Sequence, residues 1–153
     1  YNTMFAKLPR QTAAHFYRSY MGFDIAKQQG LLGVPEEPVD WDKKGVTQQE
    51  CAQCHATLDP LSYPFAYYNG IDGGASIYNK NRPVQLGLWT AEDNVQGMMM
   101  HTPVQSLVDM ATQAAKSDQF KRKVTLMFYH HAIGNGARPE DTNEFTDWWQ
   151  SWA

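Results

Sequence analysis

The sequence predicts an all-α fold with long irregular loops, and three features carry that prediction. Apolar residues recur at intervals of three and four along four stretches, which is the spacing of one helix face. Thr, Ser or Asp precedes these stretches, as is typical of helix N-caps. Segments rich in proline and glycine separate them and indicate loops. At 153 residues the chain is long enough for one domain with its own core.

Two helices are predicted in the first part of the chain. The first covers residues 12–28, and a proline-containing loop follows over 30–45. Thr47 and Glu50 then form a capping-box pattern, in which each side chain bonds the other residue's backbone N–H. This pattern predicts a short helix over about 47–57. The apolar face of the first helix consists of Ala13, Phe16, Tyr17, Tyr20 and Met21.

The middle of the chain lacks a helical period. A loop rich in proline, glycine and aromatic residues is predicted over 59–74, followed by an irregular segment over 76–89 in which a short strand pair is one interpretation.

Three helices are predicted in the last third. Thr102 begins a second capping-box pattern, Ser117 caps the next helix and residues 134–136 end it. Asp141 begins the last helix. The predicted apolar stripes are Val104, Leu107, Val108, Ala111 and Ala115; Phe120, Val124, Met127, Phe128 and His131; and Phe145, Trp148, Trp149 and Trp152.

Charge and hydropathy exclude two classes of partner. The net charge is −3 and no basic stripe is present, so nucleic acid is not an expected partner. No apolar run approaches the roughly 18 residues of a membrane span. The chain begins at Tyr1 rather than Met, from which a processed or excised segment is expected.

The most informative feature is the run Cys51-Ala52-Gln53-Cys54-His55, a Cys-x-x-Cys-His (CxxCH) motif. This is the attachment signature of a c-type haem. Two cysteines three apart project from the same face of a helix, so both thiols can form thioethers to the haem vinyl groups. His55 follows at once and can bind the iron. The sequence therefore predicts Cys51, Cys54 and His55 as cofactor-binding residues for one covalent haem c, with His55 as a metal ligand.

Other interpretations of the motif stay open. A Cys51–Cys54 redox disulfide of thioredoxin type requires a βαβ context, which the sequence does not show. A zinc site requires a fourth ligand, and three ligands so close together do not suit a closed tetrahedron. The fourth ligand would come from His15, His101, His130 or His131. A chance match is the remaining interpretation.

From the motif onward the sequence resembles the C-terminal haem region of planctomycete-type secreted cytochromes. The resemblance rests on the Asp59-Pro60 step after His55, on the aromatic segment 65–73 and on a weaker helical tail. In that tail His131 stands where the family has Tyr, and Asn135 where it has Arg. The tail positions that match are Leu107, Phe120, Val124, Leu126, the run 131–135 and Asp141.

More generally the chain is similar to class I cytochromes c. That similarity implies a cytochrome c-like helical domain around one covalently bound haem, spanning 1–153, with an N-terminal helix and loop over 1–46 and the haem-binding part over 47–153. It also implies that a backbone carbonyl near Pro60 or Pro64 accepts the ring N–H of the haem-binding histidine.

The resemblance also implies a second iron ligand, a methionine, ahead of the C-terminal helices. Met100 is the preferred candidate, and the alternatives are Met98, Met99 and His101. Methionines also fill gaps in cores, so the run can have a packing role instead. His130, His131 and His15 are weaker candidates, and an open second face of the iron is a further alternative.

Together these features predict electron transport by an iron-containing haem protein, as a soluble carrier or as a subunit of a larger electron-transfer complex with redox protein partners. A haem enzyme with an open site for peroxide or a small ligand is one alternative, with His101, His130 or His131 as acid–base groups. A structural haem subunit of a larger assembly is another. Haem attachment to this motif takes place outside the cytoplasmic membrane in bacteria, which implies a periplasmic or extracellular location, with membrane association through a complex.

Overall fold

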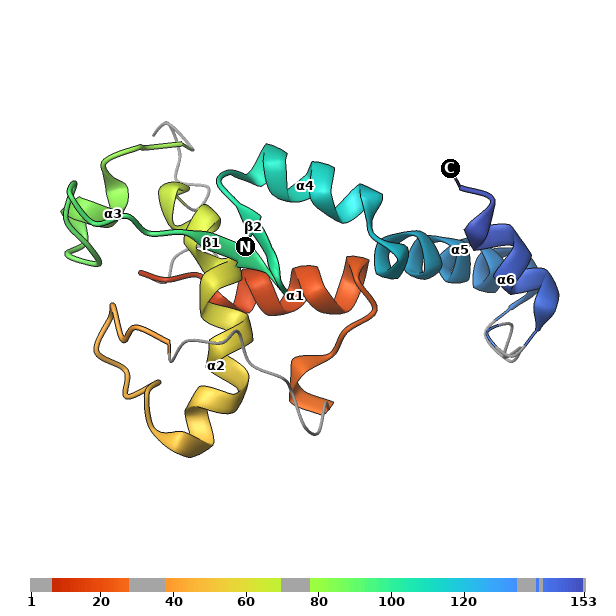
Figure 1. Cartoon of the computed structure of the whole chain (residues 1–153), viewed down its shortest axis with the longest axis horizontal. Helices are drawn as coiled ribbons and strands as arrows, with labels where there is room; N and C mark the ends of the chain where they lie inside the picture. The colour runs from red at the N-terminus through yellow and green to blue at the C-terminus, as the bar shows by residue number, and fades with distance from the viewer. Residues whose placement is uncertain (1–6, 28–37, 70–77, 135–139, 141, 153) are drawn as a thin grey trace.

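The computed structural model describes residues 7–27, 38–69, 78–134, 140 and 142–152. In these residues the chain is mainly helical, as predicted, with one antiparallel hairpin (Figure 1). The α-helices are α1 (Arg10–Tyr20), α2 (Gln49–Ser62), α3 (Arg82–Gln85), α4 (Leu107–Lys116), α5 (Asp118–Ile133) and α6 (Asn143–Gln150). The 3₁₀ helices are η2 (Ile25–Lys27) and η3 (Tyr63–Tyr67), and the strands are β1 (Gly97–Met99) and β2 (Thr102–Val104).

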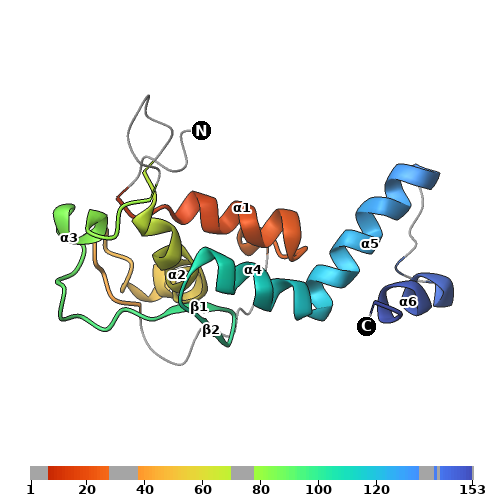
Figure 2. The same ribbon diagram turned by 90° about the horizontal axis from the view of Figure 1, so that it is seen from above.

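Helices α1 and α2 pack against each other in the body of the molecule, and the hairpin lies between α2 and α4. Helices α5 and α6 contact each other at the end of the molecule opposite α3, in both views (Figures 1 and 2). The main core is formed where α1, α2, the hairpin and α4 meet. Its buried residues are Ala13, Tyr17, Met21, Ile25, Leu61, Phe65, Met99, Val104, Met110 and Ala114.

Helix α1 is shorter than predicted. It ends at Tyr20, and Gly22 at φ +67° turns the chain away from the helix. Ala13, Tyr17 and Met21 are buried as expected, but Tyr20 is half-exposed. Of the predicted loop over 30–45, residues 30–37 lie outside the described part.

Helix α2 is longer than predicted, and its start is different. Gln48 occupies the N-cap position without a side-chain hydrogen bond, so the capping box at Thr47 is wrong. The helix runs through Pro60 to Ser62 and continues as η3, where a loop was expected. Burial explains the extension, because Leu61, Phe65 and Ala66 fill the core and tertiary packing overrides local signals. The described part of 76–89 holds α3 and a single bridge between Tyr68 and Tyr78.

The predicted helix start at Thr102 is also wrong. Thr102 lies in β2, which pairs with β1 in the register Gly97↔Val104 and Met99↔Thr102. The pairing is close, since a Cβ on Gly97 would lie 2.6 Å from the Val104 carbonyl oxygen. The cap of α4 is Ser106, whose hydroxyl accepts a hydrogen bond from the backbone N–H of Asp109.

The last two helices begin close to their predicted starts, and α5 ends where predicted, but both bury less than predicted. Ser117 caps α5, Gly134 at φ +99° ends it, and Thr142 rather than Asp141 caps α6; Asp141 lies outside the described residues. Phe145 is fully buried, whereas other members of the predicted stripes are largely exposed. The exposed members are Met127, Phe128 and His131 on α5 and Trp148 and Trp152 on α6; on α4 the stripe residues Val108, Ala111 and Ala115 are exposed as well.

A second core cluster surrounds Tyr63, whose ring meets Trp89 edge to face at 5.9 Å. Burial, followed by the nearby Asp59 carboxylate, raises the pKa of Tyr63 to about 12. The phenol therefore ionises in the unfolded chain first, and the stability that it contributes below pH 10 is lost as pH rises through 12.

We expect the free energy of unfolding to fall between about pH 10 and 12. In Tyr63→Phe the slope of this free energy against pH should be smaller by up to about 1.4 kcal/mol per pH unit. Urea unfolding at a series of pH values measures this. Tyr20→Phe, at a half-exposed tyrosine on α1, is the control and should leave the slope unchanged. An equal slope in wild type and Tyr63→Phe would contradict the expectation.

Candidate cofactor site on helix α2

The Cys-x-x-Cys-His motif occupies the first turns of α2. Cys51 and Cys54 are free thiols, and both are partly exposed. Since they are three residues apart on a regular helix, they share one face. Cys54 and Leu58 line a cavity of about 530 Å³ between α2 and α1, whose wall includes Ala14, His15 and Ile25. Cys54 is thus both reachable and next to an apolar surface.

The ring of His55 is held by a buried carboxylate one turn further along α2. Its Nδ1 lies 2.8 Å from Oδ1 of Asp59, a side chain with no exposed surface. A carboxylate only accepts hydrogen bonds, so Nδ1 carries the proton and the lone pair of a neutral ring is on Nε2. The expected carbonyl near Pro60 or Pro64 is therefore wrong, since the partner is the side chain of the residue before Pro60.

The Asp59 carboxylate is in turn held by Arg10, from the first turn of α1. Arg10 Nε donates to Asp59 Oδ1 at 2.7 Å and Nη2 to Oδ2 at 2.8 Å. The other edge of the guanidinium binds Asp42, with Nη1 to Oδ2 at 2.6 Å and Nη2 to Oδ1 at 2.9 Å. Burial lowers the pKa of Arg10, but the bonds to Asp59 and Asp42 outweigh burial and raise that pKa above its ordinary value. We call His55, Asp59, Arg10 and Asp42 the histidine relay.

The histidine relay joins three segments that are far apart in sequence. The buried polar atoms of the relay all have hydrogen-bond partners, because no buried side-chain nitrogen or oxygen among the described residues lacks one. Two carboxylates surround one guanidinium, so the relay apart from His55 carries one net negative charge. This arrangement favours a histidine whose ring is fixed through Nδ1 and whose Nε2 is left to bind a ligand, as carboxylate partners do for metal-binding histidines.

The predicted methionine run lies at the tip of the β-hairpin and its three side chains diverge. Met99 is buried in the main core. Met98 lines a cavity of about 220 Å³ with Ala56 and Pro60 of α2. Met100 lines a different cavity, of about 460 Å³, with Met21. His55 is not among the residues that line either cavity.

Met100 has an unusual backbone. Met100 and His101 form the two-residue turn between the strands, and Met100 has φ +54°, a region that favours glycine. Its N–H donates to the hydroxyl of the buried Tyr17 at 2.9 Å, which ties the turn to α1. Burial raises the pKa of Tyr17 to about 12, although the Met100 N–H works in the opposite direction.

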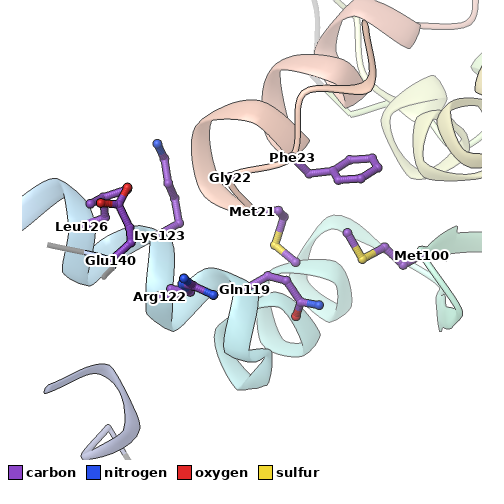
Figure 3. A pocket seen from close by; sticks show the side chains of 9 residues that line it. All are labelled: Met21, Gly22, Phe23, Met100, Gln119, Arg122, Lys123, Leu126 and Glu140. Carbon is purple, nitrogen blue, oxygen red and sulfur yellow. The ribbon is translucent and has the colours of Figure 1, made fainter. Parts of the chain in front are cut away.

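The Met100 cavity has one apolar and one charged side. The side chains of Met100 and Met21 point into the same space from the hairpin and from the end of α1, with Phe23 beside them (Figure 3). Arg122 and Lys123 of α5 line the opposite side.

The other candidate histidines lie apart from the motif. His15 is exposed on α1 and its Nδ1 lies 2.9 Å from Nη2 of Arg18. His130 and His131 lie in the last turn of α5, where His131 is exposed rather than part of a buried stripe. His101 is exposed at the hairpin turn. In the part of the chain that the structure describes, no three His, Cys, Asp or Glu side chains are grouped to hold a metal ion.

Sequence reasoning missed Arg10 and Asp42, and it assigned no role to Asp59. The four-residue spacing from His55 to Asp59 on a helix is a local signal for that contact. No local signal marks Arg10 or Asp42, because their contacts with α2 depend on the packing of α1 and of the segment before α2.

Comparison with protein-family models, with curated proteins and with solved structures finds no match to this chain. None of the helices in the described ranges is long and apolar enough to cross a membrane.

Proposed function

We propose that the chain carries one covalent c-type haem on Cys51 and Cys54, with His55 as iron ligand, and that it transfers electrons as a carrier or as a subunit of a redox complex. The observation that carries the proposal is the contact between His55 Nδ1 and the buried Asp59 carboxylate. It leaves Nε2, the nitrogen that an iron ligand uses, without an intrahelical partner and fixes the direction of the ring.

The residues present fit such a group. Two free, partly exposed thiols lie on one helix face. Cys54 borders a cavity whose lining combines apolar side chains with Gln11, His15, Arg18 and Asp24. The ring of the adjacent His55 is held by Asp59. A bound haem supplies a one-electron couple between ferrous and ferric iron. The protein's part is to hold it through the two cysteines, to present His55 Nε2 and to keep the histidine relay shielded from water.

Met100 is the proposed ligand on the second face, with Met98, Met99 and His101 as alternatives. The support is its position in the methionine run, together with a backbone at φ +54° that costs a non-glycine residue about 1–2 kcal/mol, a kind of strain that is frequent at functional sites. Haem attachment at this motif takes place outside the cytoplasm in bacteria, so we place the protein in the periplasm or outside the cell.

Production of the chain in a bacterial periplasm with the haem-attachment machinery tests the proposal. We expect wild type to retain haem through acid–organic extraction, with the pyridine haemochrome spectrum of two thioethers. Cys51→Ala/Cys54→Ala should retain none, and the control Gln150→Ala, at an exposed residue of α6 that lines none of the cavities described above, should equal wild type. A wild-type chain without extraction-resistant haem, when a reference cytochrome c is loaded in the same cells, would refute the proposal. A high-spin spectrum that responds to cyanide or carbon monoxide would instead indicate the enzyme alternative.

A further inference from the structure

We propose that Asp59 is a positioning residue that, backed by Arg10 and Asp42, makes His55 a strongly donating iron ligand and lowers the reduction potential of the bound haem. This inference rests on the proposed function and deepens it. It assigns control of the reduction potential to Asp59, Arg10 and Asp42, three residues outside the attachment motif.

The first step is the nature of the hydrogen-bond acceptor. A backbone carbonyl is neutral, whereas the Asp59 carboxylate is an anion with no exposed surface, 2.8 Å from His55 Nδ1. Charge-assisted hydrogen bonds are roughly twice as strong as neutral ones. The ring therefore gains anionic character, which stabilises ferric over ferrous iron at Nε2 and so lowers the potential.

The second step is the role of Arg10. A buried carboxylate would be costly without a partner, and here both of its oxygens are occupied by one guanidinium, at 2.7 and 2.8 Å. Because Asp42 takes the other edge of Arg10 with bonds of 2.6 and 2.9 Å, the cation is shared between two anions. Asp59 therefore keeps part of its negative charge available to His55, whereas an exclusive ion pair would neutralise it.

Spectroelectrochemical titration of the haem-loaded protein tests the inference. Asp59→Asn keeps an acceptor oxygen but removes the charge, and should raise the potential by at least about 59 mV, a tenfold change in the ratio of oxidised to reduced protein. The control is Asp40→Asn. Asp40 is near Arg10 and His55, but its carboxylate accepts hydrogen bonds from the backbone N–H groups of Lys44 and Gly45. Asp40→Asn should change the ratio of oxidised to reduced protein by less than about threefold.

A second variant keeps the inference testable if Asp59→Asn does not fold. Asp42→Asn leaves the Asp59–His55 contact in place, but Asp59 then becomes the only carboxylate paired with Arg10. The reduction potential should therefore rise, by less than in Asp59→Asn. Unchanged potentials in the folded, loaded variants, or shifts no larger than that of Asp40→Asn, would overturn the inference. Such a result leaves the proposed function intact, because haem attachment in wild type is measured separately.

Discussion

Replacing Arg10 by methionine should lower the free energy of unfolding by about 3–5 kcal/mol, the usual effect of removing one partner from a buried charge pair. The methionine fills a similar volume, so the loss comes mainly from charge. It leaves Asp59 and Asp42, with 0% and 4% of their side chains exposed, without their cation. It also removes the link between α1, the segment before α2 and α2 itself.

Arg18→Met is the matched control for this prediction. Arg18 lies on the same helix, is exposed, and its side-chain contact is with His15 at 2.9 Å. The control should change stability by no more than about 0.5 kcal/mol, as is usual for surface substitutions. Urea unfolding of the two variants and wild type, with the midpoint and slope fitted together, gives both numbers. Equal midpoints for Arg10→Met and Arg18→Met would show that the histidine relay contributes little to the fold.

The sequence predicted those parts of the fold that depend on local chemistry. Ser117 caps α5 and Gly134 ends it because a hydroxyl and a glycine satisfy helix ends almost independently of context. The Thr102 pattern has the same local form and failed, because Val104 is fully buried as a strand residue facing the core. Burial of a single side chain is enough to outweigh a helix cap.

The apolar stripe of α5 shows a second limit of local reasoning. Periodicity identifies a helix face but not whether another element covers it. Phe128 and Met127 belong to the predicted stripe, yet 61% and 52% of their surfaces are exposed. Helix α5 extends away from the body of the molecule (Figure 2). The same limit applies to the candidate site. The motif residues are adjacent in sequence, whereas Arg10 and Asp42 reach Asp59 through the tertiary fold.

The ligand proposal predicts that Met100→Ala abolishes the far-red methionine–iron charge-transfer band of the oxidised, haem-loaded protein. The band requires a thioether on the iron, and alanine has none. The low-spin spectrum should then give way to a form that binds added imidazole. Met98→Ala is the matched control, because Met98 belongs to the same run and lines another cavity. It should keep the band.

Met100→Gly separates the role of the side chain from the strain in the backbone. Glycine and alanine both remove the thioether, but only glycine adopts φ +54° without a Cβ clash. The Gly variant should therefore be about 1 kcal/mol more stable than the Ala variant in urea unfolding, while both lack the band. A band that survives in both variants would exclude Met100 as ligand and direct attention to Met98, Met99 and His101. If both variants lose the band and Met100→Gly is more stable than Met100→Ala, the chain keeps a strained methionine at this turn because its sulfur binds the iron.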